Sequence, residues 1–490
     1  MRTYWAAILA VLAAMGANAQ RNADDTPLPQ DPKQLIYGHA RVVHAPPTFT
    51  PPPGPLLFLD EYFIDASENV SREVESPQRR ESIPNPIVTG KEDGCFQPYM
   101  TVLRDEEKDV FRLWYGRHTD AMDSNRSRIG YLESTDGIRW ERPARTLNDP
   151  GPIQFGVAVV DTGANAPELT RRYIYAWHID GWLSLAGSAD GIAWSPLDPS
   201  RVVKHSHDIN GLYFDPVRNR FVATISVYRP GYDWKNNRRV TMHSLSTDLK
   251  SWSVPHYVVL PSTEVDDGET QFYAMDGYLA RGRTVIGMVK VLRDDLKADD
   301  PPDPPDAYGV GYTALAWSHD GVHWLRDTAH FFDPDPRKGA WDHAHAWIDE
   351  QVPVGGDVYL YYGGYARGHK VNRFEERQIG LVTMKRDRYV ARVAGKTPGV
   401  LRTVPFTFIG ESLSINANAS GGGIRVRVLD DTGGPVRGFS YEDCTPITGD
   451  SLDAPIEWKA KAVALRGKLI RLEFALKDAR LYALNIVGAE

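Results

Sequence analysis

The sequence predicts an all-β fold, a five-bladed β-propeller followed by a carboxy-terminal β-sandwich. A recurring hairpin motif, the strand patterns around it and a change of pattern after Lys396 predict this fold. The motif S-x-D-G-x-x-W occurs at 134–140, 188–194 and 318–324, and the copy at 246–252 lacks only the glycine. Asp-Gly supplies the positive φ of a hairpin turn, and the Trp restarts a strand with a large apolar face. Four copies in series indicate a repeat fold.

The spacing of the motif indicates one blade per copy. Successive motif tryptophans are 54, 58 and 72 residues apart, and each interval divides into four short strands. We expect blades over 96–140, 153–194, 207–252, 270–324 and 344–393, the last without a Trp and ending in a strand at 389–393. Trp140, Trp194, Trp252 and Trp324 should pack between neighbouring blades. The acidic, proline-rich stretch 299–305 explains the longest interval as a loop.

Four segments are predicted along the chain. Residues 1–19 read as a signal peptide, with Arg2, a short apolar run and Ala17-Asn18-Ala19, which implies a secreted or periplasmic protein; an uncleaved anchor is the alternative. Residues 20–55 form a proline-rich linker. The propeller follows over 56–394 and the β-sandwich over 395–490, where short alternating strands and Gly-rich turns suit two packed sheets.

Composition limits the class of partner. The formal net charge of −8 leaves no basic stripe for nucleic acid, and no stretch is long enough to predict a membrane span. The aromatic content of 11% suits a neutral ligand such as a glycan. Cys95 and Cys444 lie in different predicted domains and outside any metal or redox spacing, so we expect two unpaired thiols. The sequence does not predict an oligomeric state.

The hairpins, the approach Asn85-Pro86-Ile87-Val88 and the carboxy-terminal sandwich together resemble the five-bladed propeller glycosidases of glycoside hydrolase families 32, 43 and 130. Trp341-Asp342-His343 followed by Tyr361-Tyr362-Gly363-Gly364-Tyr365 is similar to exported bacterial family 32-like proteins of unsettled substrate. The resemblance implies a propeller and glycoside hydrolysis. The Asp-box of sialidases is a less close match, because it places a residue between Asp and Gly.

The candidate catalytic residues follow from propeller geometry. The inner strands of all blades start at one end of the central axis, so side chains there converge whatever their sequence separation. Asp208, Glu269 and Asp342 stand at three of these starts. Hydrolysis needs a carboxylic acid and a carboxylate about 5–10 Å apart. We assign Glu269 as proton donor in a half-apolar setting, Asp208 as base or nucleophile, and Asp342 with His343 as orienting groups; Asp60 is the alternative acid.

Polar and aromatic residues near the same loops are predicted to bind substrate. They are Gln97, Trp182, His207, Trp234, Trp341, His343, Tyr362 and His369. No cofactor and no metal site are predicted; calcium at Asp208 and Asp342 is the open alternative, because a hard cation suits carboxylates better than imidazoles.

The predicted function is an exported glycoside hydrolase that acts on a poly- or oligosaccharide. A lectin-like propeller without catalysis is the alternative, and a sialidase is a weaker one. Paired carboxyl groups, one with a raised pKa, distinguish the enzyme from the lectin.

Overall fold

A computed structural model describes residues 28–31, 44–46, 49–117, 127–144, 147–150, 153, 155–163, 171–205, 207, 209–231, 233–298, 309–369, 371–372 and 374–488. The fold in this part of the chain is almost entirely β, with two short helical turns, α2 (Gly90–Asp93) and η3 (Ala462–Leu465). The predicted signal peptide lies outside these residues, as does most of the predicted linker. In the described part, no helix is long and apolar enough to cross a membrane.

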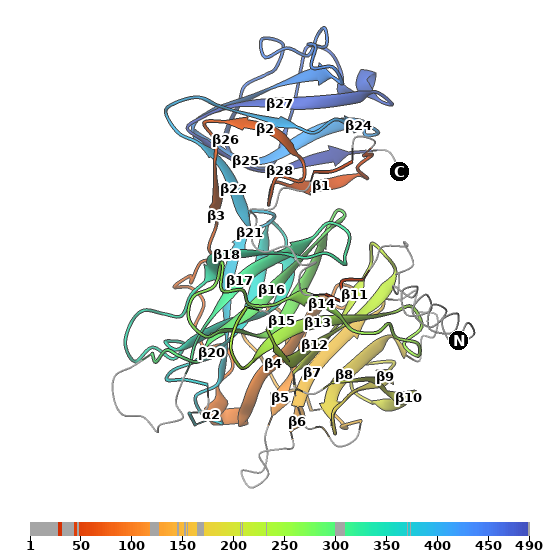
Figure 1. Cartoon of the computed structure of the whole chain (residues 1–490), viewed down its shortest axis with the longest axis vertical. Helices are drawn as coiled ribbons and strands as arrows, with labels where there is room; N and C mark the ends of the chain where they lie inside the picture. Colours follow the sequence, from red (N-terminus) through yellow and green to blue (C-terminus); the bar gives the residue numbers. More distant parts are fainter. Residues whose placement is uncertain are drawn as a thin grey trace, which may run out of the picture.

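Five consecutive groups of antiparallel strands make up the larger part of the molecule (Figure 1). Group 1 contains β4 (Cys95–Asp105), β5 (Val110–Arg117) and β6 (Arg128–Ser134). Group 2 contains β7 (Phe155–Asp161), β8 (Tyr173–Ile179), β9 (Trp182–Ser188) and β10 (Ser195–Lys204). Group 3 contains β11 (Asn210–Asp215), β12 (Arg220–Pro230), β13 (Asn237–Ser246) and β14 (His256–Val259).

The last two groups share one seven-stranded sheet. Group 4 contains β15 (Thr270–Arg281), β16 (Thr284–Arg293), β17 (Val310–Ser318) and β18 (Leu325–Phe332). Group 5 contains β19 (His345–Val354), β20 (Asp357–Tyr365) and β21 (Gln378–Lys385). A single parallel pairing, Gly311 with His345, joins β17 to β19.

The first strands of the five groups form a closed cycle. β4 contacts β7, β7 contacts β11, β11 contacts β15, β15 contacts β19, and β19 returns to β4. Val159 N in β7 donates to Thr101 Oγ1 in β4 over 2.9 Å, so a side chain also links two of these strands. Residues far apart in sequence therefore meet along one common axis.

The motif hairpins share one hydrogen-bond pattern. Asp136 Oδ1 accepts from the backbone N–H groups of Ile138 and Arg139, each over 2.8 Å, and Ser134 Oγ accepts from Gly137 N over 2.9 Å. Asp190, Asp248 and Asp320 accept the same pair of bonds. Leu249 has a φ of 62° where the other copies have glycine, so the copy at 246–252 forms the same turn.

A side chain of the preceding group clamps three of the hairpins. Tyr361 Oη donates to Gly137 O over 2.9 Å, Trp114 Nε1 to Gly191 O over 2.9 Å, and Arg220 Nη2 to Gly321 O over 3.0 Å. The Trp that ends each motif copy directly follows its turn, and β10 and β18 begin directly after Trp194 and Trp324. That all four tryptophans pack between neighbouring groups stays a prediction. Trp194 and Trp324 are buried, whereas Trp140 and Trp252 are half-buried.

The rest of the chain forms one ten-stranded sheet above the groups in Figure 1, curled around an apolar core that includes Leu401, Ile415 and Phe474. Its strands are β1 (Gly54–Leu57), β2 (Ile64–Glu68), β3 (Ser71–Val74), β22 (Val390–Ala394), β23 (Gly399–Thr403), β24 (Phe406–Thr407), β25 (Ser412–Asp430), β26 (Ile447–Pro455), β27 (Leu469–Lys477) and β28 (Ala479–Val487). Cys444 is buried here as a free thiol.

The predicted domain boundaries at 56 and 394 differ from the sheets. β1, β2 and β3 precede the groups in sequence, yet they pair with β28, β23 and β22 of the ten-stranded sheet. The strand expected at 389–393 as the last of the fifth blade is β22, which pairs with β3 and β28 and not with β21. These pairings join residues that are far apart in the chain, so no local sequence pattern predicts them.

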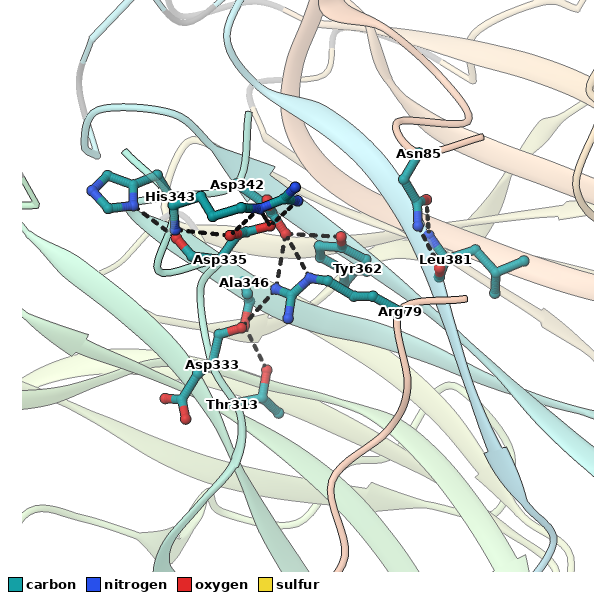
Figure 2. Close-up of polar contacts among 11 residues, drawn as sticks. Arg79, Asn85, Thr313, Asp333, Asp335, Asp342, His343, Ala346, Tyr362 and Leu381 are labelled. Atoms are coloured by element: carbon teal, nitrogen blue, oxygen red, sulfur yellow. Dashed lines mark hydrogen bonds and ion pairs between the residues drawn. The ribbon is translucent and has the colours of Figure 1, made fainter. Parts of the chain in front are cut away.

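An amino-terminal segment takes the place beside β21 that was expected for 389–393. Gln78 bridges Thr383, and Val88 bridges Ile379. Asn85 fixes the register: its Nδ2 donates to Leu381 O and its Oδ1 accepts from Leu381 N, each over 2.8 Å (Figure 2). The Asn85-Pro86-Ile87-Val88 stretch therefore lies along the fifth group, although the first group follows it in sequence.

Candidate functional site

Polar side chains from three groups converge near the starts of the first strands. Arg239 of β13 donates from Nε to His207 Nε2 over 3.3 Å, and from Nη1 to Gln271 Oε1 over 2.8 Å and to Asp294 Oδ2 over 3.5 Å. Gln271 Nε2 donates to the same Asp294 oxygen over 2.6 Å. Tyr273 and His369 extend this set, and we name these six residues the mouth cluster.

The floor of the mouth cluster is aromatic. His369 Nε2 and Tyr273 Oη lie 2.9 Å apart, and Tyr273 stacks on Trp347 with ring centres 4.7 Å apart. The guanidinium of Arg239 lies 5.4 Å from the ring centre of Tyr273, a cation–π distance. Arg377, which is buried, donates to the backbone carbonyl of His369. Ring stacking and a cation–π contact thus position the polar groups of the mouth cluster.

His207 of the mouth cluster and two histidines beside it are neutral. Burial lowers the pKa of His178 to about 4 and that of His205 to about 3. Burial, with the charge of Arg239 adding, lowers the pKa of His207 to about 2. His178 Nδ1 and His205 Nε2 lie 3.1 Å apart in one hydrogen bond. Neutral imidazoles can each donate and accept one hydrogen bond, which suits hydroxyl groups of a ligand.

The predicted catalytic residues have three different outcomes. Asp208 lies outside the described residues. Glu269 directly precedes β15, two residues before Gln271, and its side chain is exposed. The half-apolar setting expected for Glu269 is therefore wrong, because its neighbours Thr270 and Gln271 turn inward while Glu269 ends the preceding turn in solvent.

Asp342 lies in a separate buried cluster. Its Oδ2 accepts from Arg79 Nη2 over 2.9 Å, from Arg79 Nε over 3.2 Å and from Tyr362 Oη over 2.9 Å (Figure 2). Trp341 packs on the Tyr362 ring, and His343 Nδ1 lies 2.7 Å from Asp335 O. The structure thus brings together Trp341, Asp342, His343 and Tyr362, but around Arg79 of the amino-terminal segment. These contacts tie that segment to the fifth group.

The remaining predicted residues lie at the ends of strands. His207 and His369 belong to the mouth cluster. Trp182 is the first residue of β9 and is half-buried; Trp234 is buried, with the guanidinium of Arg238 5.6 Å from its ring centre. Gln97 lies in β4, where nothing is described of its side chain. Asp60, the alternative acid, accepts from Trp317 Nε1 over 2.7 Å and lies 3.0 Å from His319 Nε2.

A second polar site lies further along the axis. A cavity of about 330 Å³ is lined by residues of all five first strands, among them Asn210, Asp276, Asp349 and Glu350. Lys290 pairs with Asp349 and, over 3.0 Å, with Asp276. We name Asp276, Lys290, Asp349 and Glu350 the axial cluster. Its charges come from three strands, β15, β16 and β19.

Protonation in the axial cluster departs from that of exposed groups. Burial raises the pKa of Asp349 to about 8, with Lys290 opposing and Asp276 adding to the rise. Burial likewise raises the pKa of Glu350, and the carboxyls of Asp349 and Asp276 add to it. Burial alone would lower the pKa of Lys290, but the two aspartates raise it above its usual value. Lys290 is therefore charged at neutral pH, while burial shifts Asp349 and Glu350 towards their protonated forms.

The sequence did not predict Arg239, Gln271, Tyr273 and Asp294 as site residues of the mouth cluster, nor any residue of the axial cluster. Gln271 had a signal, since it stands near the start of a predicted inner strand. Arg239 and Asp294 come from other strands or their ends, where the convergence argument does not apply. Among the residues that the structure describes, no group of three or more His, Cys, Asp or Glu is placed to hold a metal ion.

Comparison with known proteins gives similar folds at low identity. No protein-family model matches the sequence, and no curated protein matches it. A glycosyl hydrolase from Bacteroides ovatus is 14% identical with a TM-score of 0.42 and covers 65% of this chain and 95% of its own. The β-1,2-mannobiose phosphorylase from Listeria innocua is 12% identical with a TM-score of 0.40 and covers 65% and 97%. An N-acetylgalactosamine deacetylase from F. plautii is 13% identical with a TM-score of 0.39 and covers 69% and 96%.

Several of the solved structures with a similar fold carry glycoside hydrolase names, and one is described as a member of family 130. The overlap is confined to about two thirds of this chain.

Proposed function

We propose that this chain is an exported glycoside hydrolase, built as a five-bladed propeller, that cleaves a poly- or oligosaccharide at the mouth cluster. The observation that carries the proposal is the convergence of His207, Arg239, Gln271, Asp294 and His369 at the end of the axis where the first strands start. The closed cycle of first strands supports the propeller. Glu269, next to the cluster in sequence, supplies an accessible carboxyl group.

The proposed chemistry uses a proton donor and a carboxylate on either side of the scissile bond. Glu269 protonates the leaving oxygen, and Asp208 activates water or attacks the anomeric carbon. Arg239 and Gln271 fix Asp294, whose second oxygen is left to bind a sugar hydroxyl. The Asp342 carboxylate already accepts hydrogen bonds from Arg79 and Tyr362. We therefore assign substrate orientation to Arg239, Gln271 and Asp294, in place of Asp342 and His343.

The test is turnover on a panel of plant and algal glycans, followed by reducing-end detection. Glu269→Gln should keep the fold and glycan binding while it lowers turnover by about two or more orders of magnitude, as expected for loss of a general acid. Glu264→Gln is the matched control, since Glu264 is an exposed carboxyl in the preceding turn. Equal turnover of the two variants would remove Glu269 from the mechanism.

A glycan-binding protein without catalysis is the second candidate. The observation in its favour is that the described carboxyls with raised pKa along the axis, Asp349 and Glu350, belong to the axial cluster and not to the mouth cluster. Binding of a panel glycan without any release of reducing ends, in the wild type as in Glu269→Gln, would establish this alternative.

A further inference from the structure

Four basic side chains line one edge of groups 2 and 3, at the end of the strands where the mouth cluster lies. Lys204 ends β10, and Arg229 of β12 stands directly opposite Arg238 of β13. Lys235 lies in the turn between those two strands. We name Lys204, Arg229, Lys235 and Arg238 the basic rim. Lys204 and Lys235 are exposed, and the two arginines are half-buried.

The charges of the basic rim are not compensated within the described part of the chain. None of the four has a carboxylate partner there, whereas Arg218 pairs with Asp215 over 3.0 Å at the other end of the same sheet. Asp233, in the same turn as Lys235, accepts instead from Thr263 N and Thr263 Oγ1 over 2.9 and 3.0 Å. Like charges directly opposite on paired strands repel each other. An anion between Arg229 and Arg238 would relieve that repulsion.

A cavity of about 210 Å³ opens beside the basic rim. Lys204 and Arg229 line it together with His205, Ile225, Val227 and Met242. The neutral His205 forms a hydrogen bond with His178. His207, two residues further along the chain, belongs to the mouth cluster. The cavity thus lies at the same end of the strands as the mouth cluster, on the face of the group 3 sheet opposite to Arg239, and offers two cations, one neutral imidazole and an apolar wall.

An aromatic residue stands next to these cations. Trp182 lies directly opposite Lys204 in the β9–β10 pairing and is half-buried. An aromatic face packs against the apolar face of a sugar ring, and a guanidinium binds carboxylate or sulfate oxygens in a bidentate manner. The combination fits a sugar that carries a negative charge better than a neutral one.

We propose that the basic rim and its cavity bind an anionic sugar of the substrate, through a carboxylate or a sulfate ester. This inference rests on the proposed function and narrows its substrate to acidic glycans. The overall net charge of −8 would repel an acidic polymer, so binding requires a local patch of this kind. Arg229 and Arg238 hold the acidic group, and Lys204 and Trp182 hold the ring.

The experiment measures binding by the full chain and not turnover. Polygalacturonate and a sulfated galactan are compared with methyl-esterified polygalacturonate and a neutral galactan, which lack the charge. The rim variant is Arg229→Gln with Arg238→Gln. The control is Lys250→Gln with Arg283→Gln, two exposed cations away from the rim. Neither pair belongs to the mouth cluster.

The rim variant should bind one of the acidic glycans about tenfold or more weakly, with a smaller dependence of affinity on salt, while the control binds as wild type. The two acidic polymers separate carboxylate from sulfate recognition. Equal binding by the rim variant and the control, or wild-type preference for the neutral glycans, would overturn the inference. Equally tight, rim-dependent binding of duplex DNA would also overturn it, because the rim would then recognise polyanions and not sugars.

Failure of this inference is distinguishable from failure of the proposed function. A chain that binds acidic glycans through the rim but releases no reducing ends contradicts the hydrolase alone. A chain that hydrolyses a neutral glycan and binds equally with and without the rim arginines contradicts the acidic substrate alone.

Discussion

Lys290 and its three carboxyl neighbours on the axis make the free energy of unfolding depend on pH. The folded pKa of Asp349 is about 8, whereas an unfolded Asp titrates near about 4. The folded state therefore binds more protons between these values, and stability decreases as pH rises through this window. The raised pKa of Glu350 acts in the same direction.

Asp349→Asn should flatten the fall of the thermal midpoint between about pH 4 and pH 8, because one titrating group is removed while Asp276 still pairs with Lys290. Differential scanning fluorimetry across this range measures the effect. Asp109→Asn, at an exposed carboxyl, is the control and should keep the wild-type slope. A parallel curve for Asp349→Asn would show that Asp349 is ionised in the folded protein.

At the level of single residues, the sequence predicted the residue types of the site better than it predicted which side chains contact one another. His207 and His369 were predicted and do belong to the mouth cluster. Asp342 was chosen because it stands before an inner strand, yet its carboxylate pairs with Arg79, more than 250 positions earlier. A contact with so distant a residue leaves no trace in the local pattern, so the sequence could not distinguish a structural carboxylate from a catalytic one.

Among the elements, the motif hairpins were the most predictable. Their Ser and Asp side chains satisfy the turn backbone locally, so four residues suffice to fix the conformation. The clamp from the preceding group was not predictable, since Tyr361, Trp114 and Arg220 are different residue types that bond to equivalent carbonyls of three hairpins.

Gly191→Ala tests this clamp. Gly191 has a φ of 73°, and a Cβ there would meet Trp114 Cζ2 at 2.8 Å. Strain and the steric clash together should cost about 2–4 kcal/mol. Gly355→Ala, with a φ of 58° and no described atom within 4 Å of the added Cβ, should cost only about 1 kcal/mol. Chemical denaturation measures both; equal costs would mean that the clamp contributes nothing.

On the scale of the whole molecule, the sequence predicted the order of the strand groups but not the course of the amino-terminal segment. The repeat marks four groups and stops before residue 396, so a boundary there was the natural inference. Four strands of the ten-stranded sheet, β1, β2, β3 and β22, nevertheless lie before that boundary. No periodic pattern in the sequence predicts which strands pair between opposite ends of the chain.

Residues 395–490 expressed alone should therefore be unfolded, because β23 and β28 lose their partners β2, β1 and β22. A permuted fragment, 389–488 joined by a flexible linker of about eight Gly and Ser residues to 49–74, restores all ten strands. It should unfold cooperatively in circular dichroism. Cooperative unfolding of 395–490 alone would mean that the amino-terminal strands are dispensable.

The pairing of Gly54 with Ile486 also sets the order of events during synthesis. The segment 54–88 leaves the ribosome first, yet its partners in β21 to β28 are the last to emerge. At ordinary rates of translation this delay is about 20–80 s, during which β1 to β3 expose unpaired edges. We expect the edges of β1 to β3 to need protection during this time, because these strands can join their sheet only when the last strands exist.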